Sequence, residues 1–108
     1  MRIGVAAVAI CALATGARGR PDPQHRTVVI EQFGFSPAEL RVTIGDTVEW
    51  VNHDPFYHST AADSAAWTSP EFARGERFLM PTTQQGRFPY HCTAHPVMRG
   101  VLIVQGRQ

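Results

Sequence analysis

The amino-acid sequence predicts an all-β protein folded as an antiparallel β-sandwich, and two features of the chain indicate this class. Short segments that are rich in β-branched residues, or that alternate polar with apolar side chains, recur along the sequence. Such segments are typical of strands that bury one face, and glycine, proline and aspartate separate them at close spacing. The 108 residues suffice for one domain with a modest core.

The first residues have the character of a secretory signal. A positive start precedes an uncharged apolar run at 3–13, and small residues within 12–17 offer cleavage sites. We expect a signal peptide at 1–17, a flexible mature N-terminus at 18–26 and the folded domain at 27–108. The apolar run is too short for a comfortable membrane span, so we expect an exported, periplasmic protein without such a span.

The expected strands follow one another between turn-forming residues. They lie at 27–32, 39–43, 47–52, 77–80, 87–92 and 101–104. Breaks between the first three strands are expected at residues 33–37 and at the pair Gly45-Asp46. Gly100 is expected to permit a sharp turn before the last strand. Residues 65–72 have an alternative interpretation as a short helical turn.

The charges are nearly balanced. Ten basic residues, all arginines, oppose nine acidic ones, for a net charge of +1 and a pI near 7.9. Because no dense basic patch is present in the sequence, we expect no nucleic-acid partner.

Cysteine usage points to a metal. Cys11 lies in the apolar run and leaves with the signal, so Cys92 is the only cysteine of the mature chain. A single thiol cannot form an internal disulfide in an oxidising compartment, where disulfides are common. Metal ligation would explain why an exported chain keeps it.

Residues 88–104 contain three metal-capable side chains between two apolar runs. Cys92, His95 and Met98 are spaced three positions apart. A thiolate, an imidazole and a thioether together suit copper, whereas zinc and calcium have little use for the thioether. The alternation along 87–92 places Cys92 on the inward face of its strand.

The segment from Tyr90 to Gly100, YHCTAHPVMRG, resembles the copper loop of the cupredoxins, the blue copper proteins, and its gap lengths are most similar to those of the amicyanin branch. The segment GFSP at 34–37, with the residues up to Asn52, resembles the N-terminal half of the same family. The resemblance implies a Greek-key sandwich of about seven to eight strands and one type 1 copper ion, Cu(I)/Cu(II), per chain.

The resemblance also implies the ligand set. The first copper histidine of the family follows the Trp-x-Asn segment by several residues, at the start of the next strand, and His58 occupies that position. A trigonal site of two histidines and one cysteine with a weak axial methionine would then use four residues. These expected metal ligands are His58, Cys92, His95 and Met98. His25, His53 and His91 are expected to be solvated surface residues.

Two positions depart from the family pattern. Ser59 stands where asparagine commonly ties the two copper loops together, and its shorter side chain has to reach Thr93 to do the same. Ala94 stands where amicyanin-like loops often carry proline. Its amide has two possible directions, toward the Cys92 sulfur as a second hydrogen bond or toward another acceptor.

The leading functional hypothesis is a small soluble electron carrier, not an enzyme, that shuttles single electrons between redox partners by Cu(I)/Cu(II) cycling.

 It is expected to be a monomer that docks transient redox protein partners near His95, through a small, weak interface. Pro55, Phe56, Pro96 and Val97 would form an apolar rim there, although ordinary loop packing explains the same four residues.

The alternative hypothesis is a copper-binding module for storage or delivery. Its usual methionine-rich tract is absent, because Met1, Met80 and Met98 are the only methionines of the sequence. A copper enzyme is disfavoured because it needs further copper centres, and the sequence has no His-x-His pair. The absence of Cys-x-x-Cys-His excludes c-type haem.

Overall fold

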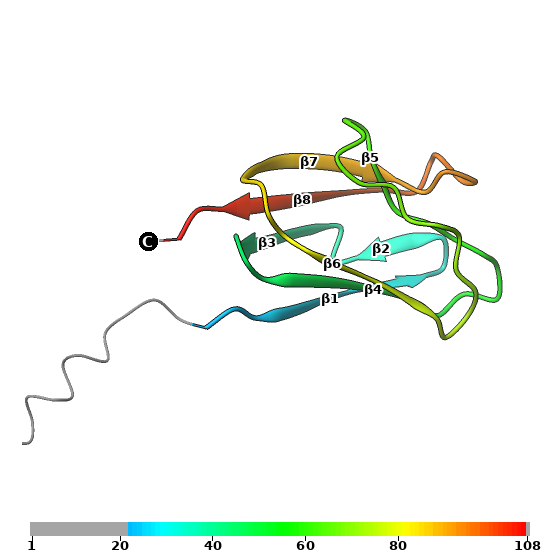
Figure 1. The fold of residues 1–108 in the computed structure, drawn as a ribbon. Helices are drawn as coiled ribbons and strands as arrows, with labels where there is room; N and C mark the ends of the chain where they lie inside the picture. The colour runs from blue at the N-terminus through cyan, green and yellow to red at the C-terminus, as the bar shows by residue number, and fades with distance from the viewer. Residues whose placement is uncertain (1–21, 108) are drawn as a thin grey trace, which may run out of the picture.

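The computed structural model describes residues 22–107, which form two four-stranded sheets packed face to face (Figure 1). The predicted signal peptide at 1–17 and Cys11 lie outside the described residues. The strands are β1 (His25–Glu31), β2 (Gly34–Ser36), β3 (Glu39–Thr43), β4 (Thr47–Asn52), β5 (Ala61–Ala62), β6 (Arg77–Pro81), β7 (Gly86–His91) and β8 (Arg99–Gln105). The described residues contain no helix long and apolar enough to cross a membrane.

The sandwich predicted from the sequence is confirmed, but its strands are not all antiparallel. One sheet has the order β2-β1-β4-β6 and the other β3-β8-β7-β5. The pairs β1 with β4 and β3 with β8 run parallel, and the remaining pairs are antiparallel. Side chains alternate with a period of two in both kinds of pairing, so the sequence pattern cannot distinguish them.

The inner faces of the two sheets form the core. Val28 and Ile30 of β1 and Trp50 of β4 are almost completely buried, as alternation predicts. Tyr90 of β7 packs edge-on against Trp50, with ring centroids 5.6 Å apart. Apolar burial of this kind, worth about 25 cal/mol per Å², holds the sheets together and fixes the strand ends that carry the site.

Three local features differ in detail from the sequence-based expectations. The first strand begins at His25, inside the segment expected to be flexible, because β1 pairs in register with β4 from His25 opposite Thr47 onward. The stretch 33–37 does interrupt β1, which ends at Glu31, but it also contains the short strand β2. Residues 65–72 form no helical turn, since the chain there pairs across to Thr60 and Ala62 through the Ser69 amide and the Trp67 carbonyl.

Gly100 has a different role from the one the sequence suggested. It lies within β8, where a Cβ atom would come within 2.5 Å of the Tyr90 ring carbon Cζ and hydroxyl oxygen. The glycine therefore makes room for the buried Tyr90 ring, and any side chain at this position would collide with that ring.

We expect Gly100→Ala to destabilise the fold by about 1–3 kcal/mol or more, because the added methyl group overpacks a rigid ring. Thermal unfolding should show a midpoint lowered by about 4–8 °C for each kcal/mol. Gly34→Ala is the matched control, since a Cβ at this strand glycine meets its nearest atom, the Glu31 carbonyl oxygen, at an ordinary 3.7 Å. Equal midpoints for the two variants would contradict the steric explanation.

Candidate metal centre

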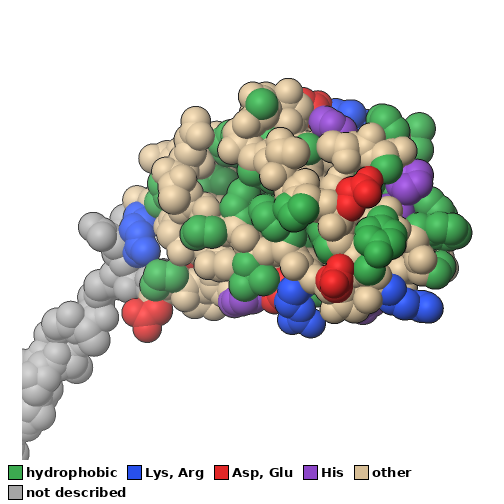
Figure 2. Space-filling view, turned by 45° about the vertical axis from the view of Figure 1, so that its right-hand side comes forward, with side chains coloured by type: hydrophobic (Ala, Val, Ile, Leu, Met, Phe, Trp, Pro, Cys, Tyr) green, Lys and Arg blue, Asp and Glu red, His purple; other side chains and the backbone are tan. Residues whose placement is uncertain are grey.

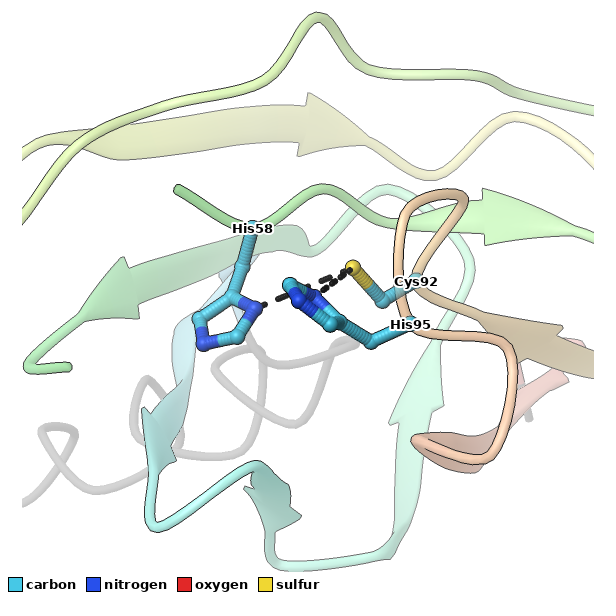
Figure 3. A group of neighbouring side chains, drawn as sticks. All are labelled: His58, Cys92 and His95. Carbon is cyan, nitrogen blue, oxygen red and sulfur yellow. Dashed lines mark hydrogen bonds between the residues drawn. The ribbon is translucent and has the colours of Figure 1, made fainter. Parts of the chain in front are cut away.

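Three metal-capable side chains converge at one end of the sandwich. The ligand atoms of His58, Cys92 and His95 all lie within 4.8 Å of one another. The Cys92 sulfur is 3.8 Å from Nδ1 of His58 and 3.7 Å from Nδ1 of His95 (Figure 3). Within residues 22–107, no other group of three His, Cys, Asp or Glu side chains has this geometry.

The loop after β7 supplies two of these residues and Met98. Cys92 is fully buried, and its amide donates to the carbonyl of Met98 at 3.2 Å. The Met98 amide donates in turn to the carbonyl of His95 at 2.9 Å, which closes the loop on itself. The Met98 side chain is buried in the same core cluster as Cys92. The loop thus brings three of the predicted residues to one place.

His58 comes from the connection between β4 and β5. It was expected at the start of a strand, but it forms an isolated bridge with Phe72, and β5 begins only at Ala61. Two backbone hydrogen bonds of 3.2 and 2.8 Å join His58 and Phe72. The side chain is fully buried, so this bridge fixes the imidazole as a strand would.

Ser59 ties the two loops together. Its amide donates to the Cys92 sulfur at 3.4 Å, and its hydroxyl lies 2.7 Å from that of Thr93 and accepts from the Thr93 amide at 2.9 Å. The shorter side chain therefore does reach Thr93. In the part of the chain that the structure describes, Ser59 supplies the only backbone N–H bonded to this sulfur, so the second donor considered at Ala94 is not formed.

Asp54 is a residue of the site that the sequence analysis missed. Its Oδ2 lies 2.8 Å from Nε2 of His58, and both side chains are buried. Desolvation raises the pKa of the Asp54 carboxyl, but hydrogen bonds from the Phe33 amide, His58 and the Gln32 amide outweigh it and hold that pKa below its ordinary value. A carboxylate only accepts, so Nε2 of the neutral imidazole carries the hydrogen and Nδ1 keeps its lone pair toward the site.

An aromatic cover lies over the two histidines. The Phe33 ring packs edge-on against His58 and His95, with centroids 5.3 and 5.2 Å away, and lies 5.1 Å from the Phe56 ring. Figure 2 shows hydrophobic and histidine side chains gathered at the right-hand end of the molecule. The large exposed hydrophobic side chains include Phe33, Phe56, Tyr57 and Val97.

The other histidines lie outside the cluster. His53 is exposed, as expected. His25 contacts the buried carboxylate of Glu49, and the half-buried His91 lies 2.7 Å from Asp63. The expectation of a solvated surface residue therefore holds for His25, which is exposed although it has an acidic partner, and only in part for the half-buried His91.

The donor set decides which metal fits. One cysteine and two histidines, with a buried methionine on the same loop as the cysteine, match the preferences of copper in both oxidation states. The Cupredoxin-like domain family model matches residues 4–104, which is most of the chain. The chain belongs to the cupredoxin family.

Relatives of this cupredoxin include two amicyanins. That of Paracoccus denitrificans is 32% identical over 83 residues, covering 72% of this chain and 63% of the relative, so the match spans under two thirds of its length. That of Paracoccus versutus is 28% identical, covering 97% of this chain and 96% of the relative. The oxidized state of a proline-to-alanine variant of amicyanin superposes with a TM-score of 0.70 at 32% identity, covering 75% of this chain and 82% of that one.

Proposed function

We propose that this cupredoxin is a small electron carrier that binds one copper ion and cycles it between Cu(I) and Cu(II). The observation that supports the proposal is the convergence of His58, Cys92 and His95 within 4.8 Å at a site built by separate segments of the fold. Copper, when bound, supplies the one-electron chemistry. The protein is then a carrier and not an enzyme.

Each residue has a separate role in this proposal. His58 and Cys92 are fully buried and would hold the ion inside the fold, and the buried Met98 would supply a weaker sulfur donor. His95 is only partly buried, so it offers the route by which an electron leaves. Ser59 and Asp54 would fix the thiolate and the first imidazole, as hydrogen-bond partners of metal ligands do.

The exposed apolar side chains around His95 suit brief docking of another redox protein. Phe56 is 51% exposed and Val97 is 89% exposed. A small apolar face favours weak, short-lived complexes of the kind that electron exchange requires. We propose that the chain acts as a periplasmic monomer, exported by the signal at 1–17, and that its partners bind at this rim.

The proposal is tested on the purified chain with copper. We expect one copper per chain, a blue band in the oxidised form and a reversible one-electron wave in voltammetry. A storage or delivery module is the alternative, and it predicts fast transfer of the ion to an acceptor protein. Rapid copper loss to such an acceptor, without a reversible wave, would favour the alternative.

We expect Met98→Gln to retain copper and to lower the reduction potential, because a harder oxygen donor favours Cu(II) over Cu(I). Voltammetry of the two proteins checks this. Met80→Gln, at a methionine of β6 outside the loop, is the control and should leave the potential unchanged. A potential that Met98→Gln does not alter would place Met98 away from the metal.

A further inference from the structure

We propose that Asp54 is a positioning residue of the copper site, whose single carboxylate holds both the imidazole of His58 and the turn that carries Phe33. The inference rests on the function proposed above and deepens it. It adds a charge that sets the reduction potential and a support for the aromatic cover of the site.

The carboxylate joins two segments that are distant in sequence. Oδ2 accepts from Nε2 of His58 at 2.8 Å and from the Phe33 amide at 2.9 Å, while Oδ1 accepts from the Gln32 amide at 2.7 Å. Three donors thus share one buried side chain. Moving the carboxylate would disturb the imidazole and the turn together.

The segment that carries Asp54 is itself held in place. Its amide donates to Oδ1 of Asn52 at 2.8 Å, and the Asn52 side-chain nitrogen donates to the carbonyls of Phe56 and Phe72 at 2.8 and 2.9 Å. Phe72 is also the bridge partner of His58. The carboxylate is therefore anchored to the backbone that positions the imidazole.

The turn between β1 and β2 depends on this support. Gln32 and Phe33 have φ angles of 52° and 56°, a left-handed conformation that residues other than glycine rarely adopt. Their amides point at the same carboxylate, and charge-assisted hydrogen bonds of this kind are stronger than neutral ones. Asp54 thus stabilises the conformation that lays the Phe33 ring against His58 and His95.

The same carboxylate places a negative charge one imidazole away from the metal. A carboxylate on the far nitrogen of a ligating histidine fixes its tautomer and makes it a stronger donor. The negative charge and the stronger imidazole donor both favour Cu(II), which carries one more positive charge than Cu(I). The charge should therefore lower the reduction potential.

The test compares Asp54→Asn with Asp46→Asn by voltammetry of the copper-loaded chains. Asn keeps an oxygen that can accept from His58 and Phe33, but it removes the charge. Asp46 is the matched control, because it is also a buried aspartate whose carboxylate accepts from two backbone amides, those of Gln24 and Thr43. It precedes β4, whereas Asp54 follows that strand.

We expect Asp54→Asn to keep the blue band and to shift the balance toward Cu(I) about tenfold, which is ~59 mV upward for a one-electron couple. Asp46→Asn should leave the potential unchanged. An unchanged potential in Asp54→Asn, or an equal shift in both variants, would overturn the role of the charge.

A second measurement uses the full chain without added metal. Hydrogen exchange of the Gln32 and Phe33 amides should be much faster in Asp54→Ala than in Asp46→Ala, and equal rates would overturn the support of the turn. If the unsubstituted chain bound no copper, the proposed function would fail, and this comparison would still decide whether Asp54 holds the turn.

Discussion

Replacing Cys92 with serine is expected to abolish the blue colour of the copper-loaded protein. The visible band of such a site arises from charge transfer between a thiolate and Cu(II), and a hydroxyl cannot supply it. Cys92 is the cysteine at the centre of the cluster, 3.8 and 3.7 Å from the two imidazoles. Visible and paramagnetic resonance spectra with one equivalent of Cu(II) measure the effect.

The substitution is nearly isosteric, so the fold should survive it. Circular dichroism of the metal-free Cys92→Ser chain checks that the sandwich forms. Ser69→Ala is a suitable control, because Ser69 is buried, its hydroxyl accepts from the Thr60 amide, and it is not among the expected metal ligands. A folded Cys92→Ser chain that kept the intense band would require another sulfur donor and would refute the assignment.

The copper loop could be predicted from the sequence because its geometry is local. Cys92, His95 and Met98 lie on one short segment, and two backbone hydrogen bonds close it. His58 is 34 positions from Cys92, so no local pattern joins them. The choice of His58 over His53 came from the family resemblance, because the position of the first copper histidine in that family supplied the spatial information that the local sequence lacks.

Asp54 and Phe33 could not be predicted in this way. Their contact spans 21 positions and depends on a turn in which two ordinary residues adopt left-handed angles. Nothing in the residue types of that turn signals such a conformation, since Gln and Phe rarely adopt it. The carboxylate of Asp54, which stabilises this turn, follows β4, and only the pairing of β1 with β4 brings Asp54 close to Phe33.

The parallel pairing of β1 with β4 has a consequence for the site. Because both strands run the same way, the turn after Glu31 and the loop after Asn52 emerge at the same end of the sheet. Phe33 and Asp54 therefore meet beside the loop that carries Cys92. An antiparallel pair would have placed these two connections at opposite ends.

We expect His58→Ala to lose the blue site, whereas His53→Ala should bind copper almost as the unsubstituted chain does. His58 is fully buried with Nδ1 3.8 Å from the Cys92 sulfur, while His53 is exposed. Removing the first imidazole leaves two strong donors, too few for a trigonal site. Visible spectra, recorded during titration with Cu(II), compare the two variants.

The His58 variant should also be less stable, which must be separated from loss of the ligand. Its substitution leaves the Asp54 carboxylate without one donor, a cost of about 1–3 kcal/mol for a buried group. Thermal unfolding of the metal-free chains shows whether His58→Ala remains folded at the temperature of the titration. A folded His58→Ala chain that still forms the blue site, beside a His53→Ala chain that does not, would transfer the ligand role to His53 and overturn the geometry of the proposed centre.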